Sequence, residues 1–240
     1  MKADSSDRRL GAVVRGWTPP PWPAAAMLQG QYVRLEPLSP DQHARALYDA
    51  YKGHEALWDY MAYGPFAGFD SYRDWMEQAV AGADTVFFAV RKLETDQVGG
   101  VASYLRIKPA AGVIEVGHIN YAPILQQTRA ATEAMALMMG WAFDAGYRRY
   151  EWKCDALNIA SRRAAQRLGF SYEGVFRQAM VVKGRNRDTA WFAVIDCDWP
   201  ILRTAFRQWL EPSNFDDKGH QIIALRDLTA PARVSSDPLI

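Results

Sequence analysis

The segment Val113–Ala134 reads VIEVGHINYAPILQQTRAATEA, and the spacing of its apolar residues changes period within it. Residues Val113–Tyr121 have the length and apolar content of a β-strand. From Thr128 onward, small and apolar residues recur at the spacing of an α-helix that runs to about Ala145. The residues that carry this spacing are Ala131, Ala134, Met135, Met138 and Ala142. The segment therefore predicts a strand, a short loop and a helix, which places the chain in the α/β class.

The rest of the body also alternates between strand and helix signals, in the order β-α-α-β-β-β-α-β-α-β-β-α. Seven strands are predicted, at Gln31–Leu38, Val86–Arg91, Val98–Lys108, Val113–Tyr121, Tyr150–Cys154, Tyr172–Val182 and Thr189–Cys197. The second, third and fourth of these are joined by short turns and predict an antiparallel meander. Helix crossovers then add further strands. We expect an α/β (α+β) domain in which helices flank a mixed central sheet of about seven strands.

Composition excludes several classes of protein. The chain has 240 residues and a net charge of +1, which gives no argument for a strongly basic surface, and we expect no nucleic-acid partner. Its two cysteines and four scattered histidines show no ligand spacing, and we expect no metal. We also expect no secretory signal and no membrane association, which favours a cytoplasmic location.

Proline and glycine mark both ends of the chain. We expect an extended N-terminal arm over residues 1–29, one domain over 30–210 and an irregular C-terminal tail over 211–240. Trp17 and Trp22 are candidates for pinning the arm to the body. The arm and the tail could also pack against a second copy in a homodimer.

Two segments point to chemistry. Pro123–Ala134 brings a strand end to a helix start, where unpaired backbone N–H groups suit a pyrophosphate. Cys154–Gly174 delivers Asn158 to the start of a second helix. Each segment taken alone has an ordinary structural interpretation, as a buried βα unit in the first case and a simple helix cap in the second.

Taken together, the two segments resemble the GNAT (GCN5-related) N-acetyltransferase superfamily, and within it the branch that includes the ribosomal-protein N-terminal acetyltransferases. The resemblance covers about Gln31 to Trp199. It is carried by YVRLEPL, IEVGHINYAP, QQTRAATEA and NIASRRAAQRLGF, in that order. It implies the acyl-CoA N-acyltransferase fold, with a sheet splayed between the fourth and fifth strands. It also implies acetyl-CoA as co-substrate and an amine as acceptor.

The resemblance implies the following residues for acetyl-CoA: Tyr121, Gln126, Gln127, Thr128, Arg129, Ala130, Ala131 and Asn158. Arg129 departs from the family pattern, which commonly has glycine there. Either the backbone at Arg129 is ordinary helix, or the cofactor contact is altered. Arg129 could itself pair with a phosphate.

Two residues are candidates for proton transfer. The family's usual tyrosine acid is replaced by Ala165, and the resemblance then implies Ser161 as donor to the leaving thiolate. Glu115 is the candidate base, since an acetyl acceptor must attack as a neutral amine. Two-residue alternation would place Glu115 on one strand face with Gly117, Ile119 and Tyr121. The alternative is an ion-paired or solvated Glu115.

The resemblance also places the acceptor pocket in an aromatic cluster that contains Trp58, Tyr63 and Phe66. The basic residues Arg162, Arg163 and Arg167 favour a solvated helix face, with the cofactor's adenosine phosphate as the other possibility. The main hypothesis is an N-acetyltransferase that acts by direct attack of a primary amine, from a protein N-terminus or a small molecule. A regulatory acyl-CoA sensor and a plain protein-interaction domain are the alternatives.

Overall fold

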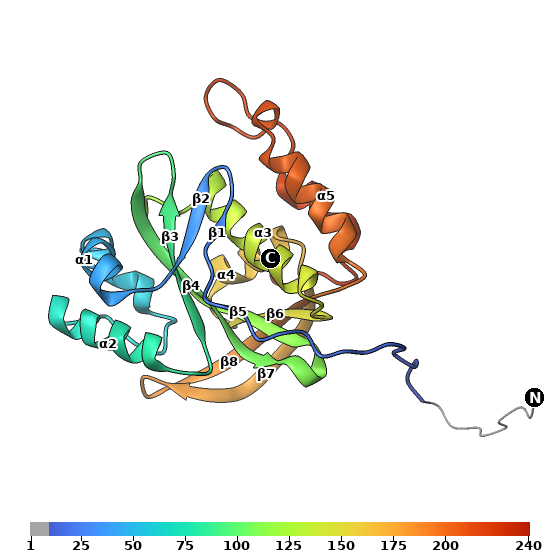
Figure 1. Ribbon diagram of the computed structural model, residues 1–240, viewed down its shortest axis with the longest axis horizontal. Coiled ribbons are helices and arrows are strands. Elements are labelled where there is room, and N and C mark those ends of the chain that lie inside the picture. The colour runs from blue at the N-terminus through green and yellow to red at the C-terminus, as the bar shows by residue number, and fades with distance from the viewer. Residues whose placement is uncertain (1–9) are drawn as a thin grey trace, which may run out of the picture.

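An eight-stranded mixed sheet runs through the computed structural model, which describes residues 10–240 (Figure 1). The strand order is β1-β2-β3-β4-β5-β6-β8-β7, and only β5 and β6 run parallel to each other. The strands are β1 (Leu28–Gln29), β2 (Val33–Pro37), β3 (Val86–Lys92), β4 (Gln97–Lys108), β5 (Val113–Tyr121), β6 (Arg149–Asp155), β7 (Ser171–Val182) and β8 (Arg185–Ile195). The predicted α/β class, mixed sheet and meander are confirmed.

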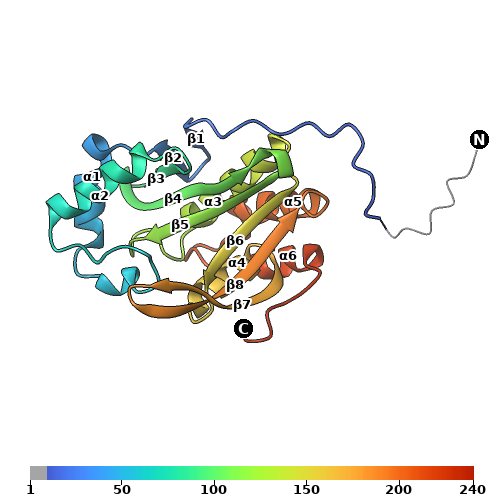
Figure 2. The same cartoon turned by 90° about the horizontal axis from the view of Figure 1, so that it is seen from below.

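Helices cover both faces of the sheet. They are α1 (Pro40–Tyr51), α2 (Phe69–Ala81), α3 (Arg129–Asp144), α4 (Ile159–Arg167), α5 (Trp199–Leu210) and α6 (Leu225–Thr229), with a 3₁₀ turn η1 at Glu55–Trp58. In β3, Phe88 and Val90 join the core beneath α3, whereas Phe87 and Ala89 join the core beneath α1 and α2. Successive strand residues point to opposite faces, so these two cores lie on opposite sides of the sheet. In Figure 2, α1 and α2 gather near β3 and β4.

The eighth strand is β1, which comes from residues expected in the N-terminal arm. Leu28 pairs with Leu35, and Gln29 pairs with Arg34. A two-residue edge strand is too short to give a periodic signal, which explains the difference from the predicted seven.

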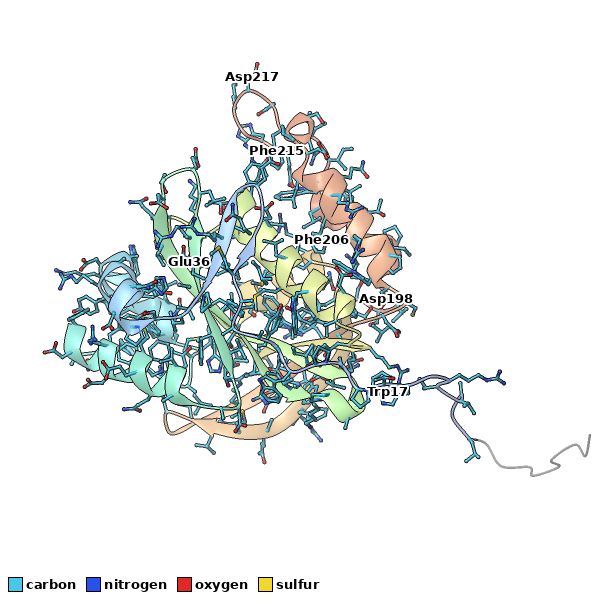
Figure 3. The ribbon with its side chains drawn as sticks, viewed as in Figure 1. Trp17, Glu36, Asp198, Phe206, Phe215 and Asp217 are labelled. Atoms are coloured by element: carbon cyan, nitrogen blue, oxygen red, sulfur yellow. The ribbon has the colours of Figure 1, made fainter. Side chains whose placement is uncertain are left out.

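The N-terminal arm is held against the body at Trp17, which lies where the arm meets the sheet (Figure 3). The guanidinium of Arg148 stacks on the Trp17 ring, with 5.7 Å between the guanidinium carbon and the ring centre. Farther along the arm, the Pro21 carbonyl accepts a hydrogen bond from the Tyr147 hydroxyl. Trp22, the other expected anchor, is exposed. Residues 1–9 of the predicted arm lie outside the described residues.

The sheet opens between β5 and β6, as the resemblance implied. The two strands pair only from Val113–Val116 and Arg149–Trp152, and their carboxyl-terminal halves separate. Just beyond the last pair, β5 bulges against β4, and His118 has a φ of 51°. A bulge bends the strand that carries it, so β5 changes direction where its partner is lost.

A buried carboxylate in α3 holds the start of β2. Glu133 accepts backbone hydrogen bonds from Gln31, Tyr32 and Val33, at 2.8, 2.6 and 3.0 Å. These charge-assisted bonds satisfy a carboxylate that would otherwise be costly to bury. They also fix α3, and therefore the loop before it, relative to the edge of the sheet.

The C-terminal segment is irregular, as expected, apart from α6 and two short 3₁₀ turns, but it packs on α4 and α5. It contributes α6, in which Leu225 is fully buried, and it brings Asp237 against Arg162. Arg162 donates to both Asp237 oxygens, at 2.6 and 2.5 Å, and is 1% exposed. The prediction of a solvated arginine face was therefore wrong for Arg162. Its partner lies 75 residues away, beyond the reach of any local pattern.

Arg167 is also partly enclosed, since it donates to Thr132 and stacks on Trp209. Of the three arginines on α4, only Arg163 is exposed. The helix face is therefore mainly an attachment surface for α3, α5 and the C-terminal segment.

Candidate active site

A cavity of about 170 Å³ lies at the opening between β5 and β6. Strands β4, β5, β6 and β8, the start of α4 and the segment after η1 all contribute to its wall. Its polar residues include Arg106, Glu115, His118, Lys153, Ser161 and Arg187. The cavity therefore brings together the two residues predicted for proton transfer, Glu115 and Ser161.

Glu115 is buried in this cavity and paired with two cations. Arg106 donates to its Oε1 at 2.5 Å, and the Nζ of Lys153 lies 2.8 Å from its Oε2. Burial raises the pKa of Glu115, while Lys153 and Arg106 oppose that rise. Glu115 is therefore ion-paired, as the alternative interpretation held. Its pKa is nevertheless raised, so it takes up a proton more readily than an exposed glutamate does.

The charged residues around Glu115 form a chain across three strands. Lys153 also lies 2.7 Å from an oxygen of Glu151, which accepts from Arg149. Lys153 is 8% exposed, and its ammonium lies 3.8 Å from the centre of the Trp191 ring. Local patterns did not single out Arg106 or Lys153, because their importance comes from strand pairing.

The predicted face of Glu115 is corrected by the bulge in β5. Ile119 and Tyr121 pack with Ile114 and Val116 in the core beneath α3. Alternation puts Glu115 on the opposite face. The extra residue at the bulge reverses the alternation, so Glu115 does not share its face with Ile119 and Tyr121.

His118 takes the position that alternation assigned to Ile119. Its ring stacks on Tyr63 at 5.7 Å, and its Nδ1 lies 3.1 Å from the Tyr63 hydroxyl. His118 also lies against Phe87, on the face of α1 and α2. The scattered histidines of the sequence gave no reason to expect His118 beside Glu115, since a bulge cannot be read from alternation alone.

Of the three aromatic residues predicted for the acceptor pocket, Tyr63 lines the cavity. Trp58 and Phe66 pack behind Tyr63 in the core beneath α1 and α2, and Trp58 is 5% exposed. Tyr60 and Met61 complete the apolar wall. The aromatic cluster thus supports the pocket from behind more than it forms its surface.

The loop between β5 and α3 presents three free backbone donors. Among residues 10–240, the N–H groups of Gln127, Arg129 and Ala130 have no acceptor. Gln127 has a φ of 60°, a left-handed conformation that is uncommon outside glycine and turns its N–H away from the regular path. Free N–H groups at a helix start suit an anion such as a diphosphate.

Other predicted cofactor residues hold this loop in shape. Gln126 donates its backbone N–H to Ala122 and its side-chain amide to the Tyr121 carbonyl. The Thr128 hydroxyl accepts from the N–H of Ala131 and caps α3. These groups are occupied by protein contacts and organise the free donors between them.

Arg129 occupies a position where the family commonly has glycine, and its backbone there is ordinary helix. It is the first residue of α3. Its guanidinium carbon lies 4.2 Å from the centre of the Phe215 ring and 5.0 Å from that of Tyr32. The side chain is therefore engaged by the C-terminal segment and by the turn before β2.

Ser161 lies in the first turn of α4 and lines the cavity at the opening between β5 and β6. Asn158 caps this helix, and its Oδ1 accepts from the Ser161 N–H at 3.0 Å. The Trp152 indole donates to the Ser161 Oγ at 3.0 Å. This bond uses a lone pair of the hydroxyl and not its proton, so the O–H can still donate, and the Cys154 thiol is a neighbour within its reach.

Comparisons with known proteins identify the fold. The model of the acetyltransferase (GNAT) domain matches residues 33–171. A GCN5-related N-acetyltransferase from Brucella melitensis is 44% identical in sequence, and its crystal structure superposes with a TM-score of 0.88 over 90% of this chain and all of that one. The chain belongs to the GNAT family of acetyltransferases.

Two further GNAT structures extend the comparison. A probable acetyltransferase from Chromobacterium violaceum is 41% identical, with a TM-score of 0.77 over 80% of this chain and 98% of that one. RimL, a ribosomal L7/L12 α-N-acetyltransferase in complex with coenzyme A, is 20% identical, with a TM-score of 0.62 over 71% and 99%. At this sequence identity, the comparison with RimL shows a common fold and nothing further about this chain. No curated protein sequence matches the chain.

The GNAT domain contains no helix long and apolar enough to cross a membrane within residues 10–240. The same described residues hold no group of three potential ligands, whether His, Cys, Asp or Glu, that could bind a metal ion. Cys154 is buried, and burial raises the pKa of its thiol to about 11. This thiol therefore stays protonated and unreactive at neutral pH.

His118 gives this GNAT domain a predicted pH dependence of stability. Burial, helped by Arg106, lowers the pKa of His118 to about 4, against about 6.5 in an unfolded chain. As the pH falls below 6.5, the unfolded chain binds a proton that the folded protein refuses. The free energy of unfolding should therefore fall by about 2 kcal/mol between pH 6.5 and pH 5 from this group alone.

Urea unfolding at a series of pH values measures this contribution. His118→Asn should remove it, so that the variant loses less stability than the wild type over the same interval. His54→Asn changes an exposed histidine and should leave the wild-type pH dependence intact. Equal pH dependence in the wild type and His118→Asn would contradict the buried, neutral state of His118.

Proposed function

We propose that the chain transfers an acetyl group from acetyl-CoA to a primary amine, by direct attack of the amine on the thioester. One observation carries the proposal. The opening between β5 and β6 holds a buried acid, Glu115, and a hydroxyl donor, Ser161, in the same cavity. Free N–H groups at the start of α3 supply a site for a diphosphate near the end of β5.

In this proposal the diphosphate binds the N–H groups of Gln127, Arg129 and Ala130, within a loop shaped by Gln126 and Thr128. The pantetheine arm then follows the opening past Asn158. Because β5 and β6 do not pair beyond Val116 and Trp152, their backbone amides are available to that arm. The thioester would lie in the cavity beside Ser161.

The chemical step needs two proton movements. A bound ammonium must first lose a proton, since only the neutral amine has a lone pair for attack. Glu115 is the proposed acceptor of that proton, either directly or through water. The nitrogen–carbon bond then forms and the carbon–sulfur bond breaks, and the Ser161 hydroxyl donates a hydrogen bond to the departing thiolate.

A specific observation makes His118 the second candidate base. Its imidazole lines the same cavity and is neutral at pH 7, because its pKa is about 4. Glu115, in contrast, is already bound to two cations. Proton transfer to Glu115 would weaken both ion pairs, whereas transfer to His118 would leave them intact but would create a buried cation near Arg106, and the low pKa of His118 makes it the weaker base.

Two measurements test the proposed function. Acetyl-CoA should raise the melting temperature, and free thiol should appear when an amine is added. An acyl-CoA sensor would be stabilised by acetyl-CoA without releasing thiol at a useful rate, and an interaction domain would not respond to acetyl-CoA. Primary amines of peptides and of small molecules should both be included in the amine panel.

Ser161→Ala should reduce kcat about 10- to 100-fold, the loss expected for one hydrogen bond to a charged group. The variant keeps its N–H, so Asn158 still caps α4. Thr204→Ala, which removes an exposed hydroxyl from α5, serves as the control and should leave kcat unchanged. A Ser161→Ala enzyme with wild-type kcat would remove Ser161 from the mechanism.

A further inference from the structure

Arg187 is a cation without a partner in the wall of the active-site cavity. It lies on β8, and its side chain contributes to the cavity lining. Its Nε is buried and has no hydrogen-bond partner in the structure. Within residues 10–240, no carboxylate lies within ion-pair distance of its guanidinium. Arg187 is half-buried as a whole, but its Nε is a buried donor without an acceptor, which is costly and points to a ligand as its partner.

The acids near Arg187 are all engaged elsewhere. Glu115 is held by Arg106 and Lys153. The Asp155 carboxylate accepts from the Leu157 N–H. Each acid of the cavity therefore already has a protein partner.

The acid next to Arg187 in sequence is also occupied. Asp188 accepts from the Gln178 N–H at 2.7 Å and from the Asn186 amide at 3.0 Å, across a bulge in β7. Its carboxylate therefore stabilises the hairpin of β7 and β8 and leaves Arg187 uncompensated.

The position of Arg187 in the sheet argues against the diphosphate of the cofactor as its partner. Arg187, Thr189 and Trp191 alternate along one face of β8, and the Trp191 ring contacts the Lys153 ammonium. Lys153 in turn pairs with Glu115. Arg187 therefore lies on the face of Glu115, whereas α3 covers the other face of the sheet.

The hairpin that carries Arg187 is fixed over the cavity. At its tip, the Lys183 ammonium donates to the Trp58 carbonyl at 2.7 Å. Tyr60 extends the contact by donating to the Leu157 carbonyl at 3.3 Å. These two bonds tie β7, β8, η1 and the start of α4 together, so the arginine has a defined place in the wall.

We propose that the acceptor of this acetyltransferase is an amine that also carries an anionic group, a carboxylate or a phosphate, which binds Arg187. A guanidinium offers a planar pair of donors that matches both groups. The amine would then point toward Glu115 and the thioester. This inference rests on the proposed function, because it names the class of acceptor for the same site.

The first test does not require turnover. The protein is saturated with coenzyme A, so that the sites for the cofactor's own phosphates are filled, and is titrated with succinate and with inorganic phosphate. At least one of the two anions should raise the melting temperature of the wild type, and this rise should disappear in Arg187→Gln. The anion that acts identifies the preferred group. Equal rises in both proteins, or no rise in the wild type, would overturn the inference.

The matched control is Arg185→Gln, which removes an exposed arginine from the same strand outside the cavity. It should respond to the anions as the wild type does. The dissociation constant of coenzyme A should also be unchanged in Arg187→Gln. A tenfold weaker coenzyme A affinity in this variant would assign Arg187 to the cofactor and overturn the inference.

The second test uses pairs of amines of which one member carries an anionic group and the other does not, namely phenylalanine against phenylalaninamide and O-phosphoserine against serinamide. The wild type should favour the anionic member of at least one pair. Arg187→Gln should raise KM for that member about 10- to 100-fold, with a smaller change in kcat. KM for the amide should stay the same.

The two proposals fail in different ways. If coenzyme A does not bind and no amine releases thiol, the proposed function fails. If amines are acetylated but the charged and amide members are used equally well, the proposed function stands and the role of Arg187 is refuted.

Discussion

Glu115→Gln should lower kcat/KM for acetyl transfer about 10²- to 10⁴-fold, the range expected when a catalytic base is removed. The replacement keeps the shape of the side chain but removes its charge. Arg106 would then lose its carboxylate partner, whereas the buried Lys153 would keep only Glu151. Steady-state thiol release over a range of amine concentrations, measured from pH 6 to pH 9, gives the loss and its pH dependence.

Glu151→Gln provides a control that shares most properties of Glu115→Gln. Glu151 lies directly opposite Glu115 on β6, is buried and also pairs with Lys153, but it does not line the cavity. This variant should keep kcat/KM within about tenfold of the wild type. Similar losses in both variants would show that the charged chain acts only by supporting the sheet.

His118→Asn separates the two candidate bases. If His118 accepts the proton, this variant should show the larger loss, and Glu115→Gln should act mainly through KM. If Glu115 accepts the proton, His118→Asn should affect the acceptor's KM more than kcat. If kcat is unchanged in both variants, neither Glu115 nor His118 accepts the proton.

Asp237→Ala should lower the free energy of unfolding by about 3–5 kcal/mol, because it leaves the Arg162 guanidinium buried without its carboxylate. For a chain of this size, that loss corresponds to a fall of about 10 °C in melting temperature. The variant also loses the acceptor for the Leu239 N–H, so the last residues should detach. Calorimetry and urea unfolding measure both effects.

Asp227→Ala is the matched surface variant, since Asp227 pairs with Arg226 at 3.5 Å in an exposed position. Its effect on unfolding should stay below about 1 kcal/mol. The double variant Arg162→Leu with Asp237→Leu should be more stable than Asp237→Ala, because no uncompensated charge remains. An Asp237→Ala protein as stable as Asp227→Ala would contradict the buried state of the pair.

The pair of Arg162 and Asp237 also connects stability to the site. The Arg162 guanidinium donates to the Ala156 carbonyl at 2.7 Å, in the turn that precedes Asn158 and Ser161. Detachment of the C-terminal residues should therefore loosen the start of α4. Asp237, which lies 76 positions from Ser161 in sequence, thus helps to hold in place the hydroxyl proposed to donate to the thiolate.

The order of elements could be predicted from the sequence, because helices and strands leave local signals. The change of period near Thr128, the cap at Asn158 and the glycine at 146 act over a few residues, and the structure confirms α3 and α4 close to their expected bounds. Glu115 and Ser161 were likewise proposed from sequence, and the structure brings both to one cavity, while their catalytic roles stay predictions.

The composition of the cavity was decided by tertiary structure. One extra residue in β5 moved His118, in place of Ile119, onto the face of Glu115, and strand pairing brought Lys153 and Arg187 to the same wall. The partners of Glu133 and Arg162 lie about 100 and 75 residues away. Periodicity and capping reflect interactions within a turn or two, so the sequence determined which elements form. The charges that face one another depend on register, bulges and long-range packing, and only the folded chain sets these.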